Sequence, residues 1–216
     1  MIDFLDVTKI YKNDSLGLKN ITLRIEAGEF IYLIGKSGAG KSTFLKLLTL
    51  EEIPTRGAIL INNQATHSFK NKEMTEYRRN VGIIFQDFKL IQELTVFDNL
   101  SYRLEIEGLK SAIIQDRVRA VLAMVGLREK ETCFPHELSG GEQQRVAIAR
   151  ACIVQPKIII ADEPTANLDD ANAFKVIELL KELNLNGTTV VIATHDEKIQ
   201  EKFPNKTLEI KHQTIT

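Results

Sequence analysis

Four short apolar runs lack the polar alternation of a half-buried strand. They are FIYLIG (30–35), VGIIFQ (81–86), KIIIAD (157–162) and TTVVIAT (188–194). Continuous apolar runs of this length are typical of strands buried on both faces, as in a parallel sheet. Residues 111–125 differ, because their apolar positions recur at helical spacing: Ile114, Val118, Val121, Leu122 and Val125. A second helix is expected from Lys41 onward, with Phe44, Leu45, Leu47 and Leu48 on one side.

The N-terminal region has a different pattern, with strand-like segments at 2–11, 20–35 and 57–64 and a turn signal at Asn62-Asn63. Residues 87–155 hold most of the helical signal and contain no buried-strand run. Strands that alternate with helices indicate an α/β core. We therefore expect one domain over residues 1–216, with a helical subdomain over 87–155 inserted into an α/β core.

Composition narrows the function classes. The chain has 216 residues, of which 44% are hydrophobic and 26% charged, and its net charge is -1. This balance gives no reason to expect a nucleic-acid partner. Cys133 and Cys152 are isolated, which fits a reduced, cytoplasmic protein better than a disulfide framework. No secretory signal is recognisable, and the apolar runs are far shorter than the roughly 20 residues that span a bilayer.

The stretch GKSGAGKS, from Gly35 to Ser42, follows the first apolar run and precedes the expected helix. It matches the pattern of a phosphate-binding loop, G-x-x-x-x-G-K-[ST], in the correct strand–helix context. Gly35, Gly38 and Gly40 let backbone N–H groups converge on phosphate oxygens. Lys41 can neutralise the phosphates, and Ser42 can ligate Mg²⁺. The alternative is a glycine-rich turn that only connects a strand to a helix.

Polar residues follow three other buried-strand runs. Asp162 and Glu163 end IIIADE, where Asp162 can hold Mg²⁺ and Glu163 can accept a proton from an attacking water. Gln86 ends VGIIFQ and could contact both the metal and that water. His195 follows VVIAT and could contact a γ-phosphate oxygen. Taken singly, these side chains have plain alternatives: a turn cap, a solvated glutamine and a loop histidine.

The stretch LSGGEQQR, from Leu138 to Arg145, begins a helix with two glycines. Ser139 suits the N-cap position, and Ser139 with Glu142 matches a capping box. Gly140 and Gly141 leave the first-turn N–H groups bare, at a cost of about 1 kcal/mol per glycine relative to alanine. The unpaired N–H groups of such a helix start can bind a phosphate. The alternative is an imperfect helix start with no ligand.

Taken in order, the phosphate loop, Gln86, LSGGEQQR, IIIADEPTANLD and ATHD resemble the ATP-binding-cassette (ABC) ATPases over nearly the whole chain. The resemblance implies a P-loop NTPase (RecA-like) core with a parallel sheet, an N-terminal antiparallel β-subdomain and an inserted helical subdomain. It also implies hydrolysis of ATP to ADP and phosphate. Two copies would form a homodimer on ATP binding, each ATP lying between residues 35–42 of one copy and 139–142 of the other.

The resemblance also assigns roles to individual residues. Tyr11 matches the aromatic residue that stacks on adenine, and the phosphate-binding loop continues through Ser37, Gly38, Ala39, Gly40, Lys41, Ser42 and Thr43. Ser42 and Gln86 match the residues that contact Mg²⁺ directly, and Asp162 matches a residue one layer further from the ion. Glu163 matches the general base, and His195 the histidine that senses the γ-phosphate. Ser139, Gly140, Gly141 and Glu142 match the contacts to the partner's ATP, and Asp169 matches the loop that communicates across the dimer.

Within the family, the motifs most resemble the ATPases of bacterial cell division. Those proteins work with a membrane-spanning subunit that controls cell-wall hydrolases, so the chain would lie in the cytoplasm, peripheral to the inner face of the membrane. The segment after Gln86, with Phe88, Leu90, Ile91, Leu94 and Phe97, would offer the docking surface, although most of these side chains are expected to pack the subdomain.

Three alternatives stay open. The chain could be the ATPase of a lipoprotein-release or macrolide-type exporter. It could be a binding module that dimerises on ATP and scarcely hydrolyses it, although Glu163 argues against this. DNA-repair members of the family are a third option, but they carry a long coiled coil, and the sequence has no such heptad run.

Overall fold

The computed structural model describes residues 1–215, and its centre is a six-stranded sheet in the order β10-β9-β3-β8-β7-β6. Neighbouring strands from β9 to β6 are parallel, and β10 turns back antiparallel to β9. The strands are β3 (Phe30–Ile34), β6 (Val81–Ile84), β7 (Ile158–Asp162), β8 (Thr189–Ala193), β9 (Lys206–Lys211) and β10 (Thr214–Ile215). Each of the four apolar runs therefore forms a strand of the parallel sheet, as the sequence predicts.

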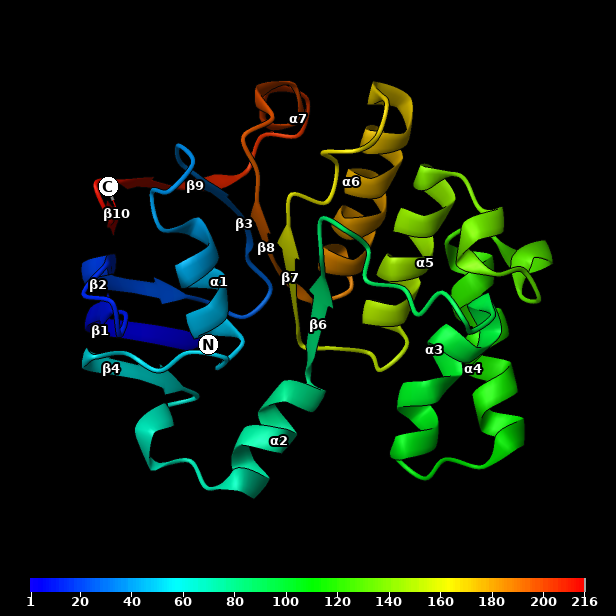
Figure 1. The fold of residues 1–216 in the computed structure, drawn as a ribbon, viewed down its shortest axis with the longest axis horizontal. Helices are drawn as coiled ribbons and strands as arrows, with labels where there is room; N and C mark the ends of the chain where they lie inside the picture. The colour runs from blue at the N-terminus through cyan, green and yellow to red at the C-terminus, as the bar shows by residue number, and fades with distance from the viewer. Residues whose placement is uncertain (216) are drawn as a thin grey trace.

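A second, antiparallel sheet forms the N-terminal side of the molecule, in the order β2-β1-β4-β5 (Figure 1). Its strands are β1 (Ile2–Ile10), β2 (Leu16–Ile25), β4 (Arg56–Ile61) and β5 (Gln64–Ala65). Asn62 and Asn63 join β4 to β5 with φ values of 50° and 67°. Asparagine tolerates this left-handed conformation better than most residues, which explains the turn signal in the sequence.

The α-helices are α1 (Lys41–Leu48), α2 (Asn71–Arg79), α3 (Val96–Ile106), α4 (Ser111–Met124), α5 (Gly140–Cys152), α6 (Asp170–Leu185) and α7 (Glu197–Lys202), with 3-10 turns at Thr66–Ser68, Arg128–Lys130 and Pro135–Glu137. Helix α1 lies beside the antiparallel sheet, whereas α3 and α4 lie at the opposite end, beyond α5 (Figure 1). The predicted α/β fold with a parallel sheet, an N-terminal antiparallel β-subdomain and a helical insertion is confirmed. No helix among residues 1–215 combines the length and the apolar character needed to cross a bilayer.

Two hydrophobic clusters fill the spaces on either side of the parallel sheet. Successive residues of a strand point to opposite faces, so Ile159 and Ala161 join the cluster formed with α3–α6, while Ile158 and Ile160 join the cluster that contains α1 and the antiparallel sheet. In the second cluster the rings of Phe4 on β1 and Phe44 on α1 stack with centroids 4.9 Å apart. Helix α1, which begins directly after the phosphate-binding loop, is thereby held against β1.

Candidate functional site

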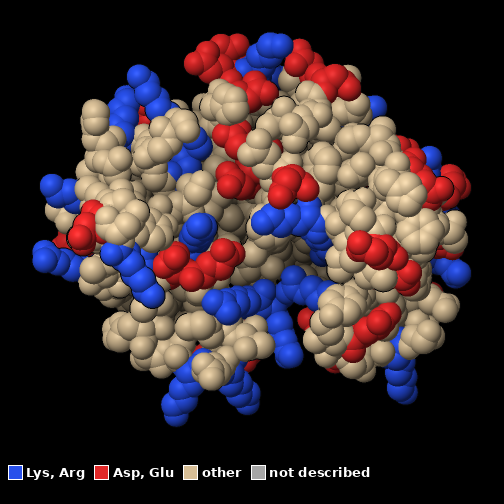
Figure 2. Space-filling view, in the orientation of Figure 1, with Lys and Arg blue, Asp and Glu red and all other residues tan. Residues whose placement is uncertain are grey.

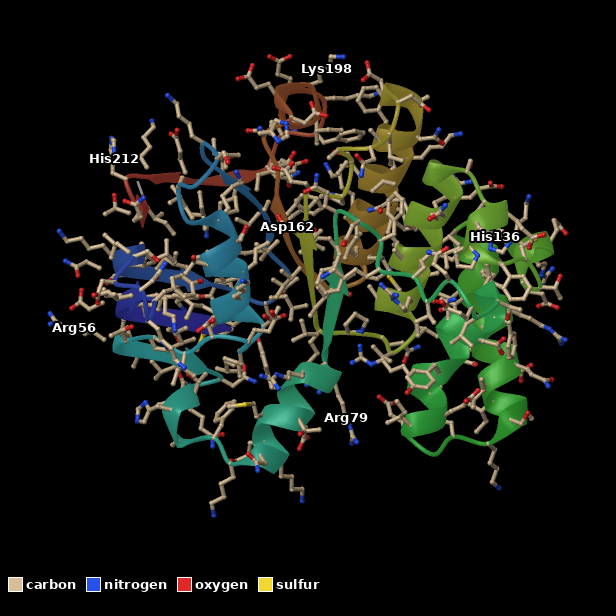
Figure 3. All side chains as sticks on the ribbon, viewed as in Figure 1. Arg56, Arg79, His136, Asp162, Lys198 and His212 are labelled. Carbon is tan, nitrogen blue, oxygen red and sulfur yellow. The ribbon has the colours of Figure 1, made fainter. Side chains whose placement is uncertain are left out.

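The carboxyl ends of β3, β6, β7 and β8 face one cavity of about 670 Å³. Figure 3 shows Asp162 at the end of β7, near the middle of the molecule. The predicted site residues that line this cavity are Tyr11, Gly35, Ser37, Gly38, Gly40, Lys41, Ser42, Thr43, Gln86, Asp162, Glu163 and His195. Because parallel strands end at the same edge of a sheet, residues more than 150 positions apart in sequence meet here. Ala39 does not line it, since its methyl group is buried in the second hydrophobic cluster.

The phosphate-binding loop depends on glycine at two positions. Gly35 has φ 152°, and a Cβ there would lie 2.6 Å from the carbonyl oxygen of Ile210. Gly40 has φ 117°, and a Cβ there would lie 2.6 Å from the carbonyl oxygen of Gly17. Only glycine satisfies both the conformation and the space. The Lys41 ammonium donates to the Gly35 carbonyl oxygen at 2.7 Å, so it is held inside the loop.

Tyr11 lies at the rim of the cavity, where its hydroxyl and that of Thr43 are 3.1 Å apart. A Cβ at Gly17 would come within 2.8 Å of the Thr43 methyl group and 2.9 Å of the Tyr11 ring, so this glycine permits the contact. Sequence reasoning missed three lining residues, Ser15, Leu16 and Gly17, whereas Lys36 lies inside the predicted phosphate-binding stretch 35–42. Gly17 lies within β2, and a glycine inside a strand often marks the close approach of another group, but the strand-like segment predicted from the sequence began only at residue 20.

The two carboxylates at the end of β7 have different environments. Burial raises the pKa of Asp162, and the neighbouring charge of Glu163 adds to this, while Lys41 opposes it. Glu163 has a left-handed backbone with φ 47°, and its N–H donates to the Ala193 carbonyl oxygen at 2.8 Å. Its carboxylate lies 2.9 Å from Nδ1 of His195. A non-glycine residue in this conformation costs about 1–2 kcal/mol, a strain that is concentrated at functional sites.

Gln86 follows β6 and is exposed at the edge of the cavity. Its carbonyl oxygen accepts a hydrogen bond from the side-chain amide of Asn167 at 3.2 Å. Asn167 precedes α6, so the main chain at Gln86 is linked to the loop that contains Asp169.

Residues 139–142 do not line the cavity, because they lie at the start of α5. Ser139 Oγ accepts from the Glu142 N–H at 3.3 Å, and a Glu142 carboxylate oxygen accepts from the Ser139 N–H at 2.8 Å. The predicted N-cap and capping box are thus confirmed. The backbone hydrogen bond from Ser139 is the main cause of a lowered pKa at Glu142, and Lys130 contributes through an ion pair at 3.4 Å. Ser139 and Gly140 are exposed.

The two glycines of this helix start are not equivalent. A Cβ at Gly140 would have only one neighbour within 4 Å, the Asn167 carbonyl oxygen at 3.9 Å. A Cβ at Gly141 would lie 3.2–3.4 Å from the side chain of Asn172. Asn172 in turn donates from its backbone and its side chain to the carboxylate of Asp169, the N-cap of α6, at 2.9 and 2.7 Å. Gly141 therefore has a packing role within the chain, which the sequence alone did not reveal.

The segment after Gln86 is mostly internal. Leu90 is buried, and Phe88 and Phe97 pack against the first hydrophobic cluster. Leu94 is half-buried, and Ile91 is 41% exposed. Of the five apolar side chains considered as a docking surface, only Ile91 presents substantial apolar area to solvent.

The sequence profile of the ABC transporter family matches residues 18–166. The chain belongs to the ABC transporter family. This ABC protein is 46% identical to the cell division ATP-binding protein FtsE of Bacillus subtilis, with 98% of this chain and 92% of that protein covered. It is 43% identical to FtsE of Mycobacterium tuberculosis, with 97% and 92% covered.

Among solved structures, the ABC protein resembles the ATP-binding cassette MJ0796 in a dimeric, post-hydrolysis state bound to ADP and phosphate. The TM-score is 0.89 and the sequence identity 37%, with 100% of this chain and 96% of that one covered. Family membership and this likeness together make the chain an ATP-binding, ATP-hydrolysing enzyme, as the motifs predict.

Proposed function

We propose that the chain is the ATPase subunit of a membrane complex in bacterial cell division, and that it works as an ATP-driven homodimer. The cell-division role is supported by relatives with that name at 42–46% identity over nearly the whole chain. The dimer is supported by the likeness to a dimeric cassette. Residues 87–155 would be the helical subdomain of this unit.

In the proposed reaction, water attacks the γ-phosphorus of ATP and ADP leaves. Glu163 accepts the proton of that water, and Lys41 neutralises charge on the transferring phosphoryl group. His195 Nδ1 lies only 2.9 Å from the Glu163 carboxylate, so the imidazole must share or leave this contact when it bonds to the γ-phosphate. Tyr11 stacks on adenine, and the backbone of residues 35–43 surrounds the phosphates.

We assign the direct Mg²⁺ contacts to Ser42 and Gln86, and we place Asp162 one layer further from the ion. The direct donors would be the Ser42 hydroxyl and the Gln86 amide oxygen, which are hard oxygen ligands of the kind that Mg²⁺ prefers, and the Asp162 carboxylate would act on the ion through water. All three residues line one cavity. The ion would add positive charge beside the β- and γ-phosphates.

The second half of each ATP site would come from the partner copy. Ser139, Gly140, Gly141 and Glu142 lie outside the cavity of their own chain, and Ser139 and Gly140 are exposed at a helix start. Such a start offers free N–H groups and the positive end of the helix dipole to a γ-phosphate. Asp169, which caps α6 next to this start, would carry the signal between the copies.

Phosphate release by the wild type and by Glu163→Gln tests the catalytic assignment. Removing a general base costs about 10²–10⁴-fold in rate, so the variant should be slower by at least about 100-fold while it still binds ATP. If both proteins turn over equally slowly and ATP still drives dimerisation, the chain is a nucleotide-dependent binding module.

The partner would be a membrane-spanning, FtsX-like subunit that holds the chain at the inner face of the cell membrane. Exposed Ile91 offers one contact point for it. A separate cleft between α2 and the end of α3, lined by residues that include Lys72, Arg79 and Glu107, offers another. Figure 2 shows Lys and Arg side chains gathered at this hollow, and Figure 3 shows Arg79 pointing toward it. Co-purification from the native host identifies the partner. Recovery of a lipoprotein-releasing or macrolide-type exporter subunit would contradict the cell-division role.

A further inference from the structure

The loop between β6 and α3 contains two consecutive strained residues. Phe88 and Lys89 have φ values of 57° and 48°, both in the left-handed region. For residues with a side chain this conformation costs about 1–2 kcal/mol each, so it persists only where surrounding contacts hold it. The two residues lie directly after Gln86 and Asp87, and their conformation sets the path along which the main chain leaves the cavity.

The contact that holds this conformation comes from α5. The guanidinium of Arg150 donates from Nη2 to the Phe88 carbonyl oxygen at 2.7 Å and from Nη1 to the Lys89 carbonyl oxygen. Arg150 is half-buried, and this burial lowers the pKa of its guanidinium. A planar guanidinium can hold two adjacent carbonyls in one fixed geometry, which a lysine ammonium cannot do.

Two asparagines hold the rest of the loop. Asn99 of α3 is buried; it accepts from the Ile91 N–H at 2.8 Å and donates to the carbonyl oxygens of Ile91, Leu94 and Thr95 at 3.0, 3.1 and 2.9 Å. Asn167 holds the Gln86 carbonyl oxygen, as described above. The loop is therefore fixed by side chains from α3, from α5 and from the segment before α6, and of these anchors only Arg150 comes from the helix that begins at Ser139.

We infer that Arg150 is a positioning residue, which ties the main chain after Gln86 to α5 so that Gln86 and the Ser139 helix start move together. The inference rests on the proposed role of Gln86 and adds the element that places it. A displacement of α5 by the partner copy or its nucleotide would be transmitted through two hydrogen bonds to the residue that contacts the metal and the attacking water.

Amide hydrogen exchange and steady-state hydrolysis by the full chain test the inference. In Arg150→Lys and Arg150→Met, exchange over residues 86–91 should rise about tenfold while the β7 and β8 amides stay protected. Turnover should fall by about 10- to 100-fold, the effect of a roughly 1 Å misplacement, with KM for ATP within about twofold of wild type. Arg150→Lys should lose less turnover than Arg150→Met, because one donor is retained.

Arg103 provides the matched control, because its guanidinium also bonds two adjacent carbonyl oxygens, those of Arg78 and Arg79 at 3.1 and 2.7 Å, at the other end of β6. Arg103→Lys should lower thermal stability and leave turnover and exchange over 86–91 unchanged. Wild-type exchange in both Arg150 variants would overturn the inference. An equal loss of turnover in the Arg103 variant would also overturn it, since the effect would then be general destabilisation.

Gln86→Ala separates this inference from the proposed function. If that variant hydrolyses ATP at the wild-type rate, Gln86 has no part in the reaction. The assignment of Gln86 then fails, and with it the claim that Arg150 affects turnover by positioning Gln86. If Gln86→Ala is slow and the Arg150 variants are normal, the role of Gln86 stands and the positioning role of Arg150 is overturned.

Discussion

At the residue scale, the candidate site combines groups whose conformation or charge is individually unfavourable for folding. Glu163 is strained, and Asp162 is half-buried, so that burial and the neighbouring charge of Glu163 raise its pKa. Such groups lower the stability of the fold, a cost that proteins commonly carry at functional sites. These residues could be predicted from the sequence, because they come directly after an apolar run that is recognisable as a buried strand. The sequence did not predict the Glu163–His195 contact, since the two residues lie just after adjacent strands and only the register of β7 and β8 brings them together.

Asp162→Asn should raise the thermal stability of the nucleotide-free chain at pH 7. A carboxyl whose pKa is raised on folding favours the folded state only below its unfolded pKa, and this contribution is lost as the pH rises through the folded pKa. The melting temperature of the variant should therefore exceed that of the wild type by an amount that grows as the pH rises from about 4 to 7. Circular dichroism melts over this range test it, and a variant less stable than wild type at pH 7 would contradict it. Phosphate release should fall in the same protein.

Gly140→Ala should separate folding from turnover. The added methyl group has open space within the chain and favours the helix, so the free energy of unfolding should stay equal or rise by up to about 1 kcal/mol. Turnover should fall, because the methyl group would intrude on the phosphate of the partner's ATP. Urea unfolding and phosphate release measure the two effects.

Gly141→Ala is the comparison, and it should gain no stability, because Asn172 must move to admit the methyl group. Full turnover in Gly140→Ala would contradict the assignment.

At the element scale, the predictable elements were those with a single dominant pattern. The four buried strands, α1 and α4 could be predicted because apolar continuity or helical spacing was unmistakable. Helix α2 was not predicted, since none of its residues is buried and its sequence, NKEMTEYRR, carries no apolar stripe. Strand β9 was missed because KTLEIK is short and alternating, and the sequence does not show that it pairs with β3.

Asn99→Ala should destabilise the chain by about 3 kcal/mol, measured by urea unfolding. Asn99 makes four hydrogen bonds to the backbone, and its removal leaves buried N–H and C=O groups without partners at roughly 1–3 kcal/mol each, partly relieved by water. Asn71→Ala, on the exposed face of α2, is the control and should change stability by less than about 0.5 kcal/mol. Equal effects in the two variants would show that the loop after Gln86 does not depend on Asn99.

At the scale of the whole molecule, each chain holds two separate parts of a proposed ATP site: the cavity at the carboxyl ends of the parallel strands, and the exposed start of α5 outside it. Two chains arranged head to tail would complete two sites. The sequence reached this expectation only through the family resemblance, since no spacing along one chain reveals contacts made by another.

Glu163→Gln should therefore pass from monomer to dimer when ATP is added, because ATP is retained between the copies. Light scattering after size exclusion measures the change, with ADP as the comparison, which should leave the monomer. Gly140→Ala in the same background should weaken the ATP-induced dimer by roughly tenfold or more, the effect expected when a central contact at an interface is blocked. A dimer that forms equally well with that substitution would contradict the placement of the α5 start.

The stacked rings of Phe4 and Phe44 carry one more consequence. Helix α1, whose first residues are Lys41 and Ser42, rests on β1 through this pair. Removing the first residues of the chain, or replacing Phe4 and Phe44 by leucine or alanine, should therefore weaken ATP binding. This loss of affinity should appear before the parallel sheet unfolds. A shortened domain that lacks β1 should therefore bind ATP poorly.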